Sequence, residues 1–124
     1  MAESRSAEMA NRLRDLQAAA PDIIAAAVVT SDGLTLASAL PADVQEERIA
    51  AMSAAMLSLG ERIAAELQRG SLEEVYIRGD EGLVLLTSVG KEAVLTALSR
   101  NEAKLGIMFL EMRRAAADLE RYVS

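Results

Sequence analysis

The chain has 124 residues, about the length of one ordinary domain and too few for two well-packed cores. Its 13 Lys and Arg residues stand against 19 Asp and Glu residues, and the net charge of −6 argues against binding to nucleic acid or to an anionic membrane surface. The chain contains neither Cys nor His, which removes thiolate chemistry, disulfides and the commonest general base and metal ligand. Composition therefore argues against most classes of enzyme.

The sequence predicts a single domain over residues 1–124. No linker rich in Pro, Gly or Ser divides it, and no internal repeat is present. The first 15 residues carry charges throughout, unlike an apolar leader. The longest run without charge, Ile49–Gly60, has 12 residues, whereas a membrane span needs roughly 20. We therefore expect a soluble, cytoplasmic protein.

A helix is predicted from Ser6 to Ala20, followed by a β-hairpin. Met9, Leu13 and Leu16 recur at three- and four-residue spacing, Ser6 is a candidate N-cap, and Pro21 ends the helix. The hairpin joins two strands, Ile23–Thr30 and Leu34–Leu40, through the turn sequence Ser31-Asp32-Gly33. The first strand is apolar on both faces, which predicts a place inside a sheet.

A long second helix is predicted from Asp43 to Arg69. Asp43 and Glu46 form a pattern like a capping box, and Gly70 is a natural stop. Its large apolar residues form one stripe, namely Ile49, Met52, Met56, Leu59, Ile63 and Leu67. We expect Met52 and Met56 to lie most simply in the core, with a protein interface as the alternative. Small residues beside the stripe reflect either helix propensity or a partner surface; they are Ala50, Ala51, Ser53, Ala54, Ala55, Leu57, Ser58, Ala64 and Ala65.

Three more strands and a third helix complete the predicted fold. The strands are Leu72–Arg78, Leu83–Val89 and Glu92–Leu98, and the helix runs from about Ala103 to Tyr122 with Asn101 as its cap. The first of these strands carries charge, which marks a sheet edge. The second strand, and the third from Ala93 onward, are apolar on both faces. The order α-β-β-α-β-β-β-α predicts an α+β fold, an α/β/α sandwich with a five-stranded antiparallel sheet.

No catalytic, cofactor or metal site is predicted. Adjacent carboxylates such as Glu73-Glu74 diverge along a strand or helix, so they do not converge on one reacting atom. Gly90-Lys91 fails as a phosphate loop, because Leu85 and Glu92 stand where Gly and Ser or Thr are needed. We therefore expect a protein that is not an enzyme and that has no cofactor.

Four stretches, in this order, resemble the Roadblock/dynein light chain domain, whose bacterial and archaeal members regulate Ras-like GTPases. The stretches are Ile24–Leu34, Glu47–Met52 with Gly60–Ile63, Gly82–Thr87 and Asn101–Met108. The resemblance implies a profilin-like sandwich with the second helix on one face of the sheet and the terminal helices on the other. It also implies a homodimer, built from the long helix and the following edge strand of each protomer, that serves as a platform for a small GTPase.

An unpaired edge strand must be paired or protected, and we expect Leu72–Arg78 to pair with its own copy about a two-fold axis at Tyr76. Glu74 would then lie opposite Arg78 of the partner subunit, and Val75 opposite Ile77 of the partner subunit. The predicted dimer interface comprises Leu72, Glu74, Val75, Tyr76, Ile77, Arg78, Met52 and Met56.

The predicted function is a non-enzymatic homodimeric platform that binds and regulates a small Ras-like GTPase, by activation or by scaffolding. The predicted partner-binding residues lie on the exposed side of the second helix: Arg48, Ala51, Ala55, Ser58 and Arg62. One alternative is a small-molecule sensor domain of the profilin or PAS type, although one Phe, two Tyr and no Trp are few residues for such a pocket. Another is a pure scaffold subunit of a larger signalling or motor complex.

Overall fold

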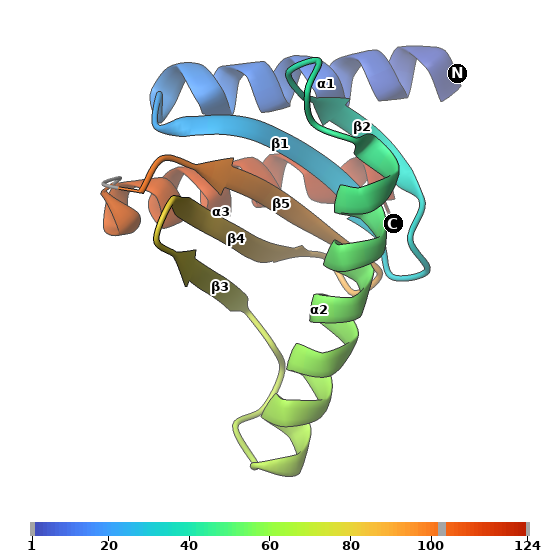
Figure 1. Cartoon of the computed structure of the whole chain (residues 1–124). Helices are drawn as coiled ribbons and strands as arrows, with labels where there is room; N and C mark the ends of the chain where they lie inside the picture. Colours follow the sequence, from blue (N-terminus) through green and yellow to red (C-terminus); the bar gives the residue numbers. More distant parts are fainter. Residues whose placement is uncertain (1, 102–103, 124) are drawn as a thin grey trace.

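The computed structural model describes residues 2–101 and 104–123, and its elements follow the predicted order (Figure 1). They are α1 (Ala2–Ala19), β1 (Ile23–Thr30), β2 (Thr35–Ala39), α2 (Glu46–Glu66), β3 (Glu74–Gly79), β4 (Gly82–Val89), β5 (Ala93–Ser99) and α3 (Leu105–Val123). The prediction of an α+β fold with this element order is confirmed.

The five strands form one antiparallel sheet in the order β2-β1-β5-β4-β3. The strands that are apolar on both faces, β1, β4 and β5, occupy the centre, and the charged strand β3 lies at an edge. Both placements were predicted. They follow from burial, since a central strand is covered on two faces and has no side left for charged groups.

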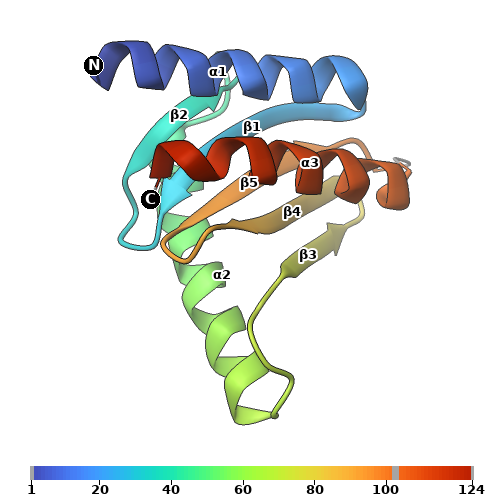
Figure 2. The ribbon, with the colours of Figure 1, turned by 180° about the vertical axis from the view of Figure 1, so that it is seen from behind.

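The helices cover the two faces of the sheet unequally (Figures 1 and 2). α1 and α3 lie side by side on one face, where Leu13, Leu85, Leu95 and Met112 are among the fully buried side chains. α2 lies alone on the other face over a smaller cluster, formed by Ala27, Val29, Ala50, Leu57, Leu86 and Val94. The predicted three-layer sandwich is confirmed, and its larger core lies under the terminal helices.

The predicted caps at the starts of α1 and α2 are wrong. α1 begins at Ala2 rather than Ser6, because the Ala and Glu residues before Ser6 favour helix. The Ser6 hydroxyl instead donates to the carbonyl of Leu36 in β2, with an Oγ–O distance of 3.2 Å. α2 begins at Glu46 after Gln45, without a side-chain cap. Glu46 Oε1 accepts a hydrogen bond from Ser38 Oγ at 2.7 Å, so its carboxylate is not part of a capping box.

The end of α2 also differs from the prediction. The helix ends at Glu66, and Gln68 takes a left-handed backbone conformation with φ 58°. The amide of Arg69 donates to the carbonyl of Ala64 at 2.7 Å, and that of Gln68 to the carbonyl of Ala65 at 3.1 Å. This is a Schellman arrangement, which Gln68 provides two residues before Gly70.

The start of α3 is observed at Leu105. The predicted first residue, Ala103, lies outside the described residues. The Asn101 side chain donates to the carbonyl of Asp80 at 3.3 Å, which ties the start of this connection to the β3–β4 turn. The Asn101 side chain was predicted to cap α3, and it instead bonds the turn between β3 and β4.

Candidate functional site

α2 meets the sheet with its small residues. Ala50, Ser53, Leu57 and Ala64 are its buried positions, and the buried hydroxyls of Ser53 and Thr96 are 2.7 Å apart, with Thr96 as the donor. Small side chains let the helix axis come close to the strands. The face that packs on the sheet therefore consists of three small residues and Leu57, whereas Ala51, Ala55 and Ser58 from the same predicted set are exposed.

Four of the six residues in the predicted apolar stripe consequently face solvent. Met52 is 59% exposed, Ile63 50% and Leu67 65%, and Leu59 is exposed as well. The prediction that Met52 lies in the core is wrong, and Met56 is only half-buried. At about 100° per residue, this stripe lies roughly a quarter-turn around the helix from the buried row. A helix can thus pack on the sheet and still carry a second apolar face.

The exposed stripe continues onto the sheet beside it. Ile77 is 50% exposed, and its neighbours across the ladder, Val84 and then Leu98, are half-buried. We name this surface the apolar patch, and it consists of Met52, Met56, Leu59, Ile63, Leu67, Ile77, Val84 and Leu98. A cavity of 140 Å³ opens within it between α2 and strands β4 and β5. The C-terminal half of α2 extends beyond the sheet at the β3 edge (Figures 1 and 2).

The backbone of β3 has one side free. The Ser88 amide donates to the Glu73 carbonyl at 3.1 Å, and bonded pairs alternate along an antiparallel ladder. The amides and carbonyls of Glu74, Tyr76 and Arg78 therefore point away from β4. Among the described residues, no other group bonds them. At the opposite edge, by contrast, the Leu36 carbonyl of β2 is bonded by Ser6.

The side chains of β3 lie on two faces. Glu74 and Tyr76 point toward α3, where Glu74 Oε2 is 2.6 Å from Arg113 Nη1 and the Tyr76 ring meets Phe109 edge-on at 6.2 Å between centroids. Val75 points toward α2, together with Leu72 in the preceding loop. These two side chains approach Gly60 so closely that a Cβ there would lie 2.9 Å from Leu72 Cδ2.

The predicted dimer residues thus form one continuous region around the β3 edge, with Met52 and Met56 on the α2 side and Tyr76 on the α3 side. Arg78 is exposed, and no ion pair of Arg78 occurs in the described part of the chain. That a second copy covers this region stays a prediction.

The predicted partner-binding residues lie along one line on α2. Arg48, Ala51, Ala55, Ser58 and Arg62 are all exposed, and their alternating spacing of three and four residues places them on the side that faces away from the sheet. Arg62 lies 3.8 Å from Glu66 in a loose exposed pair. α2 therefore has three distinct faces: a buried small row, a large apolar stripe and this outward row.

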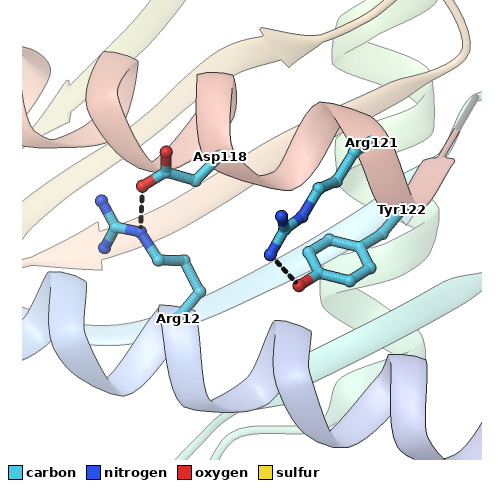
Figure 3. A network of polar contacts seen from close by, with 4 residues as sticks. All are labelled: Arg12, Asp118, Arg121 and Tyr122. Carbon is cyan, nitrogen blue, oxygen red and sulfur yellow. Dashed lines mark hydrogen bonds and ion pairs between the residues drawn. The ribbon is translucent and has the colours of Figure 1, made fainter.

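A polar groove of 460 Å³ between α1 and α3 was not anticipated from the sequence (Figure 3). Arg12 Nε lies 2.7 Å from Asp118 Oδ2 and joins the two helices. Arg121 Nη2 donates to Tyr122 Oη at 2.7 Å, and this bond raises the pKa of Arg121 above its ordinary value. Both are exposed contacts, which contribute little to stability, and only the pair of Arg12 and Asp118 connects the two helices.

Two absences apply to the described residues. Within residues 2–101 and 104–123, no three Asp or Glu side chains come together in a group that could hold a metal ion. No helix in that part of the chain combines the length and the apolar character that a membrane crossing demands.

Comparison with known proteins finds similarity in both sequence and fold. The chain is 39% identical over 93 residues to the uncharacterized protein MJ1340 of Methanocaldococcus jannaschii, which is 75% of this chain and 81% of the relative. Its structure resembles that of MglB in a tetrameric arrangement, with a TM-score of 0.87, 20% identity and coverage of 95% of this chain and 89% of the other. Myxococcus xanthus MglB gives a TM-score of 0.86 at 18% identity, with coverage of 94% and 88%.

The sequence model of the Roadblock/LC7 domain matches residues 9–99, which include α2 and all five strands. The structural neighbours share the fold of this chain over nearly its whole length. The resemblance predicted from four short stretches is confirmed. The chain belongs to the Roadblock/LC7 domain family.

Proposed function

We propose that residues 1–124 form a single Roadblock domain that acts in the cytoplasm as a homodimeric platform, and that this platform binds and regulates a small Ras-like GTPase. The proposal assigns no catalytic step to this chain. The observation that carries it is the apolar patch on α2 beside the free edge of β3. A contiguous exposed apolar surface next to unpaired backbone groups is the usual mark of an interface.

The dimer forms by pairing of β3 with its copy. A two-fold axis at Tyr76 sets Tyr76 opposite Tyr76 of the partner subunit and Glu74 opposite Arg78 of the partner subunit. These are the residues whose amides and carbonyls point outward, so each opposed pair can exchange two hydrogen bonds. A slip of one residue between the two strands, in contrast, would place outward groups of one copy opposite inward groups of the other.

The apolar patch is covered in this dimer by α2 of the partner. The C-terminal half of α2 extends past β3, and pairing of the two edges carries it over the sheet of the partner (Figure 1). Ile63 and Leu67, which are exposed in one protomer, then become buried against the apolar patch of the partner subunit. Self-association of the similar MglB, seen in a tetrameric arrangement, supports a second copy as the occupant.

The GTPase binds to the outward rows of the two α2 helices. Ala51, Ala55 and Ser58 are small, so a partner can approach the helix closely, and Arg48 and Arg62 flank them with positive charge. The GTPase supplies its own nucleotide and magnesium, and the platform acts by ordering its switch loops or by holding it in an assembly.

Affinity capture with the full-length protein tests this proposal. Small GTPases from the same organism are loaded with GDP or with a non-hydrolysable GTP analogue. We expect retention of one of them in one nucleotide state. Ala55→Glu should abolish this retention and leave the dimer intact, whereas Ala18→Glu, at an exposed site on α1, should change neither. Equal capture by Ala55→Glu and the wild type would remove the proposed surface.

Arg48 and Arg62 allow a separate test of how the platform regulates hydrolysis. We expect Arg48→Ala and Arg62→Ala to leave the rate of GTP hydrolysis by the bound GTPase unchanged, because exposed helical arginines are generally only solvated. Loss of a 10³-fold or greater stimulation, about what an arginine finger supplies, would instead identify one of them as acting in trans.

A further inference from the structure

The turn between β1 and β2 lies beside the N-terminal part of α2 and presents an exposed leucine. Leu34 is 62% exposed. Gly33, in the same turn, has a φ of 90°, and a Cβ placed on it would lie 4.0 Å from the Cβ of Ala54 in α2, so the turn lies against the helix. A hollow of 510 Å³ opens between this turn and the first turns of α2, and Leu34 is among the residues that line it.

Hydrogen bonds hold the turn in one conformation. The Thr30 amide donates to the Leu34 carbonyl at 2.8 Å, and the Gly33 amide donates to the Thr30 carbonyl at 3.0 Å. The Leu34 amide donates to Thr30 Oγ1 at 3.0 Å, and the Thr30 hydroxyl donates to the Asp32 carboxylate. A turn that is already ordered loses little further entropy when it binds, so Leu34 is suited to a contact with another protein.

The hollow borders the outward row of α2. Ala51 belongs to both, because it lines the hollow and is one of the exposed small residues of that row. Around the helix from Ala51, Ala54 lies about 60° away on the side of the hollow, and Met52 of the apolar stripe lies about 100° away on the other side. A GTPase on the outward row therefore also meets the β1–β2 turn, and the inference drawn from this rests on the proposed function.

The charges around the hollow determine which side chain it accepts. Three exposed carboxylates line it, those of Asp32, Glu46 and Glu47, and no Lys or Arg among residues 2–101 and 104–123 does so. Asp32 and Glu46 each accept a bond from a neutral hydroxyl, of Thr30 and Ser38, and so keep their charge. Glu47 has no hydrogen bond or ion pair within the described part of the chain. The N-terminus of α2 offsets only about half a unit charge.

We propose that this hollow receives a lysine or arginine side chain of the bound GTPase. The aliphatic stem of that side chain packs against Leu34 and Ala51, and its charged head lies among the carboxylates, with Glu47 as its main partner. An acidic side chain of the GTPase would be repelled here. The turn thus selects among GTPases, because those with a basic side chain at the matching position bind more tightly.

The dissociation constant of the captured GTPase, in the nucleotide state that is retained, tests this contact with the full chain. We expect Glu47→Lys to raise the Kd about tenfold at low salt and by less at high salt, since salt screens interactions between exposed charges. Leu34→Ala should raise the Kd about tenfold at either salt concentration, because it removes apolar contact area.

Matched controls lie on the opposite face of the sheet. Asp15→Lys on α1 makes the same change in charge as Glu47→Lys, and Leu110→Ala on α3 shortens another exposed leucine. Both should leave the Kd for the GTPase unchanged. The variants Glu47→Lys and Leu34→Ala should also unfold at the temperature of the wild type and keep its dimer Kd in sedimentation equilibrium, because both positions are exposed and lie away from β3.

A charge swap identifies the side chain that enters the hollow. The exposed Lys and Arg residues of the captured GTPase are replaced by Glu one at a time. We expect one of these GTPase variants to bind the wild-type chain weakly and to bind Glu47→Lys more tightly than it binds the wild type, since the two changes restore an opposite-charge pair. Failure of every swap to restore binding would overturn the proposal.

The remaining outcomes separate this inference from the proposed function. If Ala55→Glu abolishes capture while Glu47→Lys and Leu34→Ala bind like the wild type, the outward row binds the GTPase and the inference is overturned. A loss in Leu34→Ala alone would assign the hollow to an apolar side chain and would also overturn it. If the wild type captures no GTPase in either nucleotide state, the proposed function fails and the inference fails with it.

Discussion

One buried hydrogen bond joins α2 to the centre of the sheet. Thr96 donates to Ser53 across the interface, and both side chains are almost completely buried. A hydroxyl in such a place is favourable only while its partner is present, because the loss of one member leaves the other without water and without a bond. The pair therefore reports how tightly α2 is held against the strands.

Removal of one member should cost more than removal of both. We expect Ser53→Ala to lower the free energy of unfolding by about 1–3 kcal/mol, since it leaves the Thr96 hydroxyl unpaired. The double variant Ser53→Ala with Thr96→Val should be more stable than Ser53→Ala alone. Urea denaturation at one fixed protein concentration measures both values. If the losses of stability in Ser53→Ala and Thr96→Val add up to the loss in the double variant, the bond contributes nothing beyond the packing of each side chain.

At the level of the element, the end of α2 stores backbone strain. Gln68 has a positive φ, a conformation that costs a residue with a Cβ about 1–2 kcal/mol. Gln68→Gly should relieve part of this cost and raise the free energy of unfolding by up to about 1 kcal/mol, offset in part by the greater entropy of glycine in the unfolded chain. Gln68→Ala keeps the strain and serves as the control in the same denaturation experiment. An equal gain of stability in Gln68→Ala would show that the effect comes from the loss of the glutamine side chain and not from relief of backbone strain.

Most elements could be predicted from the sequence because their patterns have one physical meaning. A run such as Leu83–Val89, without a charge on either face, fits only the inside of a sheet, and the charged Leu72–Arg78 fits only an edge. Caps were less predictable, because Asp43 and Ser6 match a cap pattern locally while tertiary contacts decide where each helix begins.

The orientation of α2 could not be predicted in the same way. Periodicity shows that Met52, Leu59 and Ile63 share a face, but it does not show whether that face meets the sheet or another molecule. The helix packs on the sheet through Ala50 and Ser53, because their small side chains let it approach the strands closely and Ser53 accepts a buried hydrogen bond there. The buried hydroxyl of Thr87 could not be predicted either, since only the packed structure shows that no group within residues 2–101 and 104–123 bonds it.

For the whole molecule, the charge pattern of β3 predicts how tightly two copies bind. In the proposed register, Arg78→Glu converts two opposite-charge pairs into two like-charge pairs, each pair being worth about 0.2–1 kcal/mol. We expect the dimer Kd to rise about tenfold in sedimentation equilibrium. Arg5→Glu on α1 makes the same change in net charge away from the edge and should leave the Kd unchanged. A Kd unaffected by Arg78→Glu would place Arg78 outside the interface.

The register itself can be measured directly, because the chain has no cysteine of its own. With a two-fold axis at Tyr76, that residue faces its own copy at a Cα separation of about 5.5 Å, which a disulfide can bridge. Val75 would instead face Ile77 of the partner subunit. Under mild oxidation, we therefore expect Tyr76→Cys to form a covalent dimer and Val75→Cys to remain uncross-linked.

The same pair of variants distinguishes the alternative registers. An axis at residue 75 would reverse the result, since Val75→Cys would then meet its own copy and Tyr76→Cys would not. Cross-linking of neither, at a concentration where light scattering shows a dimer, would mean that the two copies join elsewhere. Cross-linking of Tyr76→Cys should also preserve the apolar patch in its covered state, so the oxidised dimer should resist dilution while it still captures the GTPase on the outward faces of α2.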